Sequence, residues 1–186
     1  INIGTHIYSI GQVMDSEFDN TNLNSSIDKL NSLLFAVLNE EKGALMQEEI
    51  SKAANDGDSI GGVLETAVTG IPAGVGEPWF DTAEGVLSHA LFSVPGIKGV
   101  EFGAGFSVAQ MKGSECNDNF RFENGIVVTD TNNNGGINGG ITNGMPLTFR
   151  VAVKPTPSIF ALQNTVDLKN RENTVLSLTG RHDPCI

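Results

Sequence analysis

The apolar residues of this 186-residue chain change their spacing along its length, from the period of a helix to that of a strand. Between residues 23 and 55, and again between 81 and 94, they recur every three or four positions, as in an amphipathic helix. Leu147, Phe149, Val151 and Val153 instead alternate with other residues, as in a strand with one buried face. Helices and strands are mixed without a regular strand–helix–strand rhythm. The pattern predicts an α+β fold with antiparallel sheets, in a single domain over residues 1–186.

The individual elements follow from the same periods and from turn residues. We expect helices over about 23–38, 40–55 and 81–94, and strands from residue 1, over 61–71, 106–112 and 147–153. Asn124-Gly125 predicts a tight hairpin between 120–123 and 126–128, and a second hairpin is expected over 165–178. Asp81 and Glu84 have the spacing of a capping box, and Trp79 and Phe80 are expected to anchor the core.

Charge is divided unevenly along the chain. Residues 1–97 contain fourteen Asp or Glu and three Lys, a net charge of −11, whereas residues 98–186 are neutral. The acidic total argues against binding of nucleic acid or of an anionic membrane, and no apolar run approaches the roughly 18 residues of a membrane span. An anionic ligand is expected against the second half. Two cysteines, Cys116 and Cys185, favour free thiols in a reducing, cytoplasmic compartment.

The stretch Asn132–Gly144 (NNNGGINGGITNG) has three interpretations. It can be a long flexible loop, or its glycines can allow the backbone to approach a flat ligand or a phosphate closely. The third interpretation is a calcium site, because the residues from Asp130 match the opening of an EF-hand loop. The twelfth position of such a loop should be Glu, but it is Ile141 here.

Two short segments near the end combine groups that can bind or react. Lys154–Ser158 (KPTPS) follows the alternating strand, and this stiff turn can hold an anion or simply end the strand. Arg181, His182 and Asp183 place a cation, an imidazole and a carboxylate side by side, which suits acid–base work or a surface ion pair. His6 and His89 have no spacing typical of metal ligands, and no metal site is expected.

Several segments, taken together and in order, resemble those of chorismate synthase. They are Gly57–Gly62 (GDSIGG), Gly70–Pro78 (GIPAGVGEP), Ser93–Glu101 (SVPGIKGVE), Gly113–Glu115 (GSE), Gly135–Gly144 (GGINGGITNG), Lys154–Ser158 (KPTPS) and Gly180–Cys185 (GRHDPC). Residues 1–56 contain no diagnostic motif of this family.

The resemblance implies a lyase that converts 5-enolpyruvylshikimate 3-phosphate to chorismate and phosphate by a 1,4-elimination, in aromatic amino acid biosynthesis. It implies reduced FMN as cofactor without net redox change, two antiparallel sheets around central helices, and a homotetramer. Asp183 matches a carboxylate that handles a proton near the flavin N5. The residues expected to contact FMN are Pro95, Gly96, Gly139, Lys154, Pro155, Thr156, Pro157, Ser158 and Arg181.

The sequence also departs from the family pattern. The family's Gly-Glu-Ser-His-Gly segment, its arginine-rich segments and its helical tail are absent, and Asn134 stands where a small alanine is expected. We therefore expect the central to carboxy-terminal part of a longer enzyme, inactive on its own. The alternative from a different class is a non-catalytic acidic domain that binds calcium or a partner.

Overall fold

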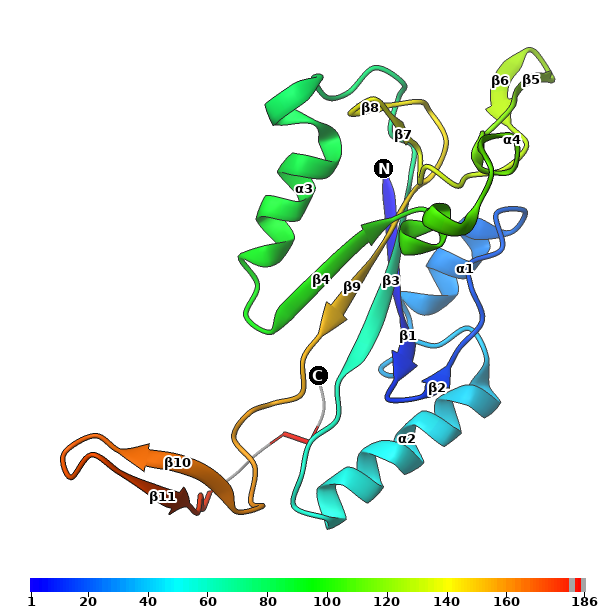
Figure 1. The fold of residues 1–186 in the computed structure, drawn as a ribbon. Coiled ribbons are helices and arrows are strands. Elements are labelled where there is room, and N and C mark those ends of the chain that lie inside the picture. The colour runs from blue at the N-terminus through cyan, green and yellow to red at the C-terminus, as the bar shows by residue number, and fades with distance from the viewer. Residues whose placement is uncertain (181–182, 185–186) are drawn as a thin grey trace.

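The computed structural model, which describes residues 1–180 and 183–184, is built around one antiparallel sheet (Figure 1). The sheet has five strands in the order β2-β1-β3-β9-β4. β3 pairs with β1 on one side and with β9 on the other, so segments far apart in sequence form its centre. The strands are β1 Asn2–Ile10, β2 Val13–Met14, β3 Gly62–Thr69, β4 Ile97–Phe102 and β9 Leu147–Val153.

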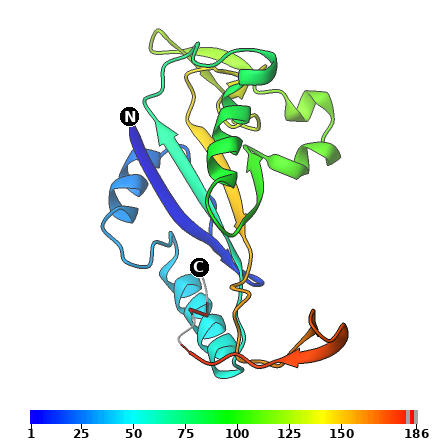
Figure 2. The same cartoon turned by 90° about the vertical axis from the view of Figure 1, so that its left-hand side faces the viewer.

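Three helices cover the two faces of this sheet (Figure 2). Leu147, Phe149 and Val151 of β9 form a core with partly buried side chains of α3 (Ala83–Phe92). On the other face, Ala67 packs with buried residues of α1 (Leu23–Leu30). α2 (Glu40–Asn55) buries Met46 against the end of β1. The α+β class with antiparallel strands packed against helices is thus confirmed.

The remaining elements are short. Three hairpins project from the sheet, and small helical segments connect the larger elements (Figure 1). The hairpins are β5 Phe120–Glu123 with β6 Ile126–Thr129, β7 Ile137–Asn138 with β8 Ile141–Thr142, and β10 Gln163–Asp167 with β11 Glu172–Leu176. The helical segments are η1 Trp79–Asp81, η2 Gly105–Gln110 and α4 Gly113–Cys116. In the described part of the chain, no helix has the length and apolar character needed to span a membrane.

Strong local signals predicted their elements accurately. The second helix begins at Glu40 and ends at Asn55, as expected. At its start, the Asn39 side chain accepts hydrogen bonds from two backbone amides. Asn124 and Gly125 adopt φ values of 52° and 81°, the left-handed pair that a two-residue hairpin turn requires. Leu147, Phe149 and Val151 are buried, and their neighbours Thr148 and Arg150 lie on the opposite face.

The first helix is shorter than its apolar spacing predicts. It ends at Leu30 instead of residue 38, and Leu34 is fully exposed. The segment after it is held by non-helical hydrogen bonds: Ile7 N donates to Ala36 O, and the amides of Leu38 and Asn39 donate to the Asp15 carboxylate. The Asp15 carboxylate is buried and therefore needs hydrogen-bond donors. The hydrogen bonds that it accepts from these amides outweigh the helical preference of the segment after Leu30.

Three other expectations, around the third helix and the segment after the following strand, were wrong. Thr82, and not Asp81, caps α3 by accepting a hydrogen bond from Gly85 N. Trp79 and Phe80 are 84% and 94% exposed, because the chain turns through a short 3-10 segment with Trp79 at a φ of 77°. The strand expected at 106–112 is the 3-10 helix η2, whose Phe106 amide donates to the Glu101 carboxylate.

Candidate functional site

The Lys154–Ser158 turn lies at the end of the sheet where β9 stops. Lys154 N donates a hydrogen bond to Gly96 O at 2.9 Å, which joins this turn to the connection between α3 and β4. Ser59 Oγ donates to Thr156 O at 2.6 Å, which joins it to the segment before β3. Gly61 has no space for a side chain, because a Cβ there would lie 2.6 Å from Val153 O. Three chain segments are therefore locked together at this point.

The segment 57–61 also brings the end of the chain to the same place. Gly57, with a φ of 68°, follows the end of α2, and its carbonyl oxygen accepts hydrogen bonds from the amides of Phe160 and Ala161. Ile60 N donates to Pro184 O at 2.8 Å, so Asp183 lies next to this segment. We call the set formed by residues 57–61, 154–158 and Asp183 the open end.

A small cavity of about 60 Å³ lies within the open end. Ser59, Ser158 and Asp183 contribute polar groups to it, and Ile159 and Phe160 contribute apolar ones. Ligand pockets for molecules of cofactor size are typically about 300–1,000 Å³. The cavity suits a small polar group, whereas a flavin ring needs a wider surface than these residues provide.

Several donors at the open end have no partner in the described part of the chain. No hydrogen bond or ion pair within residues 1–180 and 183–184 involves Lys154 Nζ, Thr156 Oγ1 or Ser158 Oγ. The Asp183 carboxylate is exposed and likewise has no partner there. One ammonium and two hydroxyls that are free to donate form a donor set that fits a phosphate.

The structure brings together some of the predicted site residues but not all. Pro95 and Gly96 adjoin Lys154 through the 2.9 Å hydrogen bond, and Ser158 and Asp183 line one cavity. Gly139 lies in the β7–β8 hairpin beside the start of α3, where Ala83 N donates to Gly140 O. That is the opposite end of α3 from Gly96 (Figure 1). Arg181 lies outside the described residues, and so do His182 and Cys185.

A second group of ionisable residues crosses the middle of the sheet, and sequence reasoning missed it. His6, Glu65, Arg150 and Glu101 occupy facing positions on β1, β3, β9 and β4, and we call this row the charge ladder. His6 is 1% exposed and Glu65 is 7% exposed. The signal available in the sequence was an ionisable residue within each strand, but only the strand register shows that the four are neighbours.

Each member of the charge ladder has opposite-charge or hydrogen-bond partners. His6 Nε2 lies 2.9 Å from Glu65 Oε2, and its Nδ1 lies 3.1 Å from Asp15 Oδ2. Arg150 Nε lies 2.9 Å from Glu101 Oε1, a charge contact without linear hydrogen-bond geometry. Arg150 also lies 4.9 Å from the centre of the Tyr8 ring. Burial raises the pKa of Tyr8, which the Arg150 charge partly offsets. The charges of the ladder are thus paired within the chain, which fits a structural role, while Arg150 Nε is buried without a hydrogen-bond partner in the described chain.

The Asn-Gly stretch forms a compact loop. The Asp118 carboxylate accepts hydrogen bonds from Thr131 Oγ1 and from the amides of Asn133 and Asn134, and the Asp130 carboxylate pairs with Arg121. Arg121 therefore already pairs with Asp130, the first ligand position of the proposed calcium loop, whereas Asn132 Oδ1 at the third position has no hydrogen-bond partner among the residues that the structure describes. Within the described chain, His, Cys, Asp and Glu form no group of three or more that could hold a metal ion.

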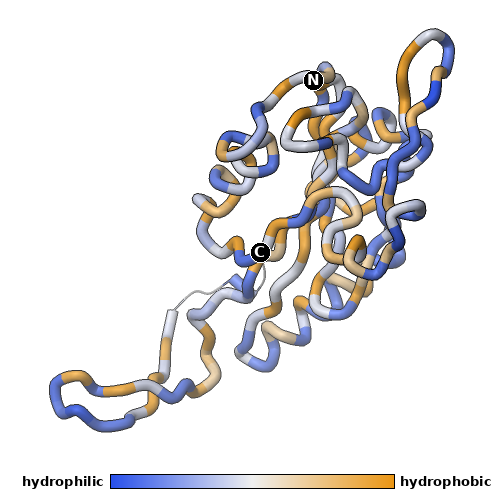
Figure 3. The backbone as a smooth tube through the Cα atoms, turned by 45° about the horizontal axis from the view of Figure 1, so that its top comes forward, coloured by the Kyte–Doolittle hydropathy of each residue, from blue (hydrophilic) through white to orange (hydrophobic). Residues whose placement is uncertain are grey.

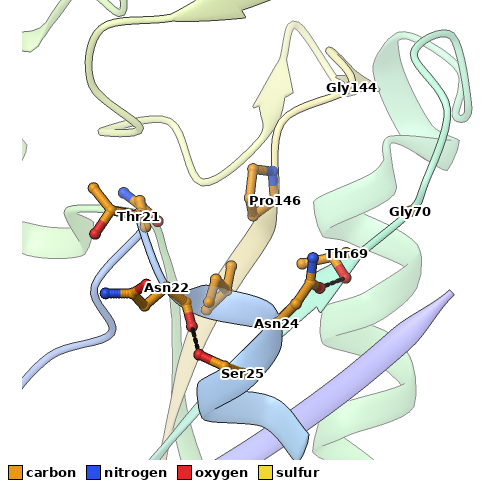
Figure 4. A pocket seen from close by; sticks show the side chains of 10 residues that line it. Thr21, Asn22, Asn24, Ser25, Thr69, Gly70, Gly144 and Pro146 are labelled. Atoms are coloured by element: carbon orange, nitrogen blue, oxygen red, sulfur yellow. Dashed lines mark hydrogen bonds between the residues drawn. The ribbon is translucent and has the colours of Figure 1, made fainter.

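A larger pocket, of about 370 Å³, lies at the start of α1 (Figure 4). Its side chains include Asn22, Asn24 and Thr69, and Thr69 Oγ1 donates to Asn24 Oδ1 at 2.8 Å. Every residue that lines it is neutral. It therefore offers no charged side chain to a ligand, in contrast to the open end.

Comparisons with known proteins agree on one family. The chorismate synthase family model matches residues 1–186, including the first 56 residues, which contain no diagnostic motif. A chorismate synthase of Thermococcus gammatolerans is 55% identical over 141 residues, which are 76% of this chain and 40% of that protein. One of Methanosarcina acetivorans is 53% identical over 146 residues, which are 78% of this chain and 40% of that protein.

The fold leads to the same family. A crystal structure of chorismate synthase matches with a TM-score of 0.76 and 34% identity, over 84% of this chain and 50% of that one. The chain thus spans about two fifths of the length of the curated relatives it matches. Sequence over the whole chain and fold over most of it show that this chain belongs to the chorismate synthase family.

Proposed function

We propose that this chain is part of a chorismate synthase that forms chorismate and phosphate from 5-enolpyruvylshikimate 3-phosphate by a 1,4-elimination. The proposed enzyme is a carbon–oxygen lyase that requires reduced FMN and acts as a homotetramer in the cytoplasm. Membership of the family supports the reaction class. Because the chain spans only part of its relatives, the reaction is assigned to a protein that also contains the rest of the family sequence.

The observation that carries the proposal is the set of unpaired donors at the open end. Buried or half-buried polar groups usually find protein partners, so donors left free in a structured turn are available to a ligand. The half-buried side chains of Lys154, Thr156 and Ser158 are such donors, and the turn is fixed on both sides by hydrogen bonds to Gly96 and Ser59. A rigid turn with a free ammonium would orient a phosphate without much reorganisation.

The residues present fit the phosphate end of FMN, and the ring needs surface from outside this chain. Lys154 would hold phosphate oxygens through charge-assisted hydrogen bonds, and Thr156 and Ser158 would add hydroxyl donors. When bound, the reduced flavin supplies electron density that helps the substrate phosphate leave. Asp183, exposed at the cavity next to Ser158, would accept or return a proton near the flavin.

The proposal is tested by measuring chorismate formation under anaerobic conditions with reduced FMN. We compare the isolated 186-residue chain with a full-length chorismate synthase that carries this segment. The full-length protein is expected to turn over, whereas the isolated chain is not, since its cavity is too small for the flavin ring and its net charge of −11 repels an anionic substrate.

Two results would contradict the proposal in different ways. Turnover by the isolated chain close to that of the full-length protein would show that the open end needs no further surface. A folded full-length protein without turnover, with flavin reduced and substrate present, would remove the assigned reaction.

A further inference from the structure

Asn-Gly occurs four times in the chain, beginning at Asn124, Asn134, Asn138 and Asn143. In such a pair the backbone nitrogen of the glycine can attack the side-chain amide carbon of the asparagine and close a succinimide ring. Glycine hinders this attack least, because it has no side chain and its backbone adopts many conformations. Whether a pair reacts in a folded protein then depends on whether its asparagine side chain and its glycine amide are free to move.

Asn124 and Gly125 form the turn of the β5–β6 hairpin, which projects away from the sheet (Figure 3). Both residues are exposed, and a Cβ added at Gly125 would meet no atom within 4 Å. Within residues 1–180 and 183–184, no hydrogen bond involves the Asn124 side chain or the Gly125 amide. The carbon that is attacked and the nitrogen that attacks it are therefore both accessible and free of protein partners.

The other three Asn-Gly pairs are held by hydrogen bonds. Gly135 is buried and its amide donates to Asn132 O at 3.0 Å, so the nitrogen that would attack the Asn134 side chain is occupied. Asn143 Nδ2 donates to Asn138 Oδ1 at 2.6 Å, which ties those two side chains together, and Asn143 Oδ1 also accepts a backbone amide. Each of these sites must open locally before it can react, and local opening costs free energy.

We propose that Asn124 is a site of spontaneous covalent modification in this protein, and that the fold protects the other three Asn-Gly pairs. The Gly125 nitrogen forms a bond to Asn124 Cγ and the Cγ–Nδ2 bond breaks. Nδ2 leaves as ammonia, with the proton that the Gly125 amide gives up. Water then opens the ring at either of its carbonyl groups, which yields aspartate or isoaspartate. The reaction needs only water and uses no residue of the open end.

The two products differ in their effect on the hairpin. Aspartate adds a negative charge beside Glu123 and leaves the length of the main chain unchanged. Isoaspartate inserts a methylene group into the main chain of the turn, so Glu123 no longer faces Ile126 in the present register. The hairpin has four such residue pairs, and a short two-stranded hairpin is marginally stable in water. Hydrogen exchange at the β5 and β6 amides should therefore become faster as isoaspartate accumulates, and unchanged exchange would remove this consequence.

Incubation of the chain at mildly alkaline pH, followed by mass spectrometry with fragmentation of its peptides, tests the inference. The rate of conversion is measured at each Asn-Gly pair in the folded chain and in the chain unfolded in urea, and the ratio of the two rates isolates the effect of the fold. At Asn124 this ratio is expected to lie within about threefold of one, because no opening is needed. At Asn134 it should fall below about one tenth, because the site must open first. Asn138 and Asn143 should also give lower ratios than Asn124.

A pair of variants gives an independent readout. Asn124→Gly removes the reacting amide and keeps the turn, because glycine readily adopts the φ of 52° found there. Ammonia release from the folded chain should lose its fastest phase in this variant and keep it in the matched control, Asn134→Gly. A rate ratio at Asn124 as low as that at Asn134, or ratios near one at all four pairs, would overturn the inference. A fastest phase that survives in Asn124→Gly would overturn it as well.

Discussion

The charge ladder and the open end are both rich in ionisable residues, but they differ in how those residues are paired. His6 and Glu65 are almost fully buried, and each charged group of the ladder faces a partner within 4 Å. At the open end, the side chains of Lys154 and Asp183 have no partner in the described chain. The two regions lie on the same sheet, since Arg150 and Lys154 are four residues apart on β9 and its extension.

This difference separates structural charges from charges available for binding. A buried charge whose partners are all protein groups cannot exchange them for a ligand without a large cost. A half-exposed cation on a rigid turn can bind a ligand anion at a small cost in free energy. Pairing within the chain, rather than the mere presence of charged residues, is therefore the better guide to the site of this family member.

The largest expected effect concerns Asp183 at the open end. In a full-length chorismate synthase carrying this segment, Asp183→Asn should lower the single-turnover rate of chorismate formation by about 10²–10⁴-fold, the usual contribution of acid–base catalysis. Flavin binding should persist, because the amide conserves the side-chain volume. Asp56→Asn, an exposed carboxylate at the end of α2, is the matched control.

The rate and the flavin affinity must be measured on the same variant. A rate within about threefold of the unmodified protein would leave Asp183 as a surface residue, since exposed pairs contribute only about 0–1 kcal/mol. A loss of rate matched by an equal loss of flavin affinity would assign Asp183 to cofactor binding and not to proton transfer.

The next effect concerns stability and the charge ladder. Arg150→Met should lower the free energy of unfolding of this chain by about 3–5 kcal/mol, because it leaves Glu65 and Glu101 without their cation. Arg121→Met is the control, since Arg121 pairs with Glu123 and Asp130 in half-exposed positions and should lose at most about 1 kcal/mol. Urea denaturation gives both values. Equal losses in the two variants would mean that the ladder is no more structural than a surface pair.

Local signals in the sequence were enough for part of the fold. The α2 helix has its own caps, and the Asn124-Gly125 turn requires left-handed backbone that these residues adopt readily. The helix after Leu23 was predicted too long because Asp15, distant in sequence, binds the amides of Leu38 and Asn39. No local sequence pattern indicates that contact.

The same limit applied to the candidate sites. Lys154–Ser158 and Asp183 stood out because their residue types are unusual together, and the hydrogen bonds of residues 57–61 bring them close. The charge ladder could not be predicted, because each of its strands contributes a single ionisable side chain to it. Trp79 and Phe80 were wrongly expected in the core, since hydrophobic character alone does not tell a core anchor from an exposed residue at a turn.

The central claim is that the open end binds the flavin, and a titration of FMN into the full-length protein tests it most directly. Lys154→Ala should raise the dissociation constant by about ten- to a hundredfold, as expected for the loss of a charge-assisted hydrogen bond. Lys42→Ala removes an equal charge from the opposite end of α2 and should leave the constant nearly unchanged. An unchanged constant in a folded Lys154→Ala protein, or equal losses in both variants, would contradict the account.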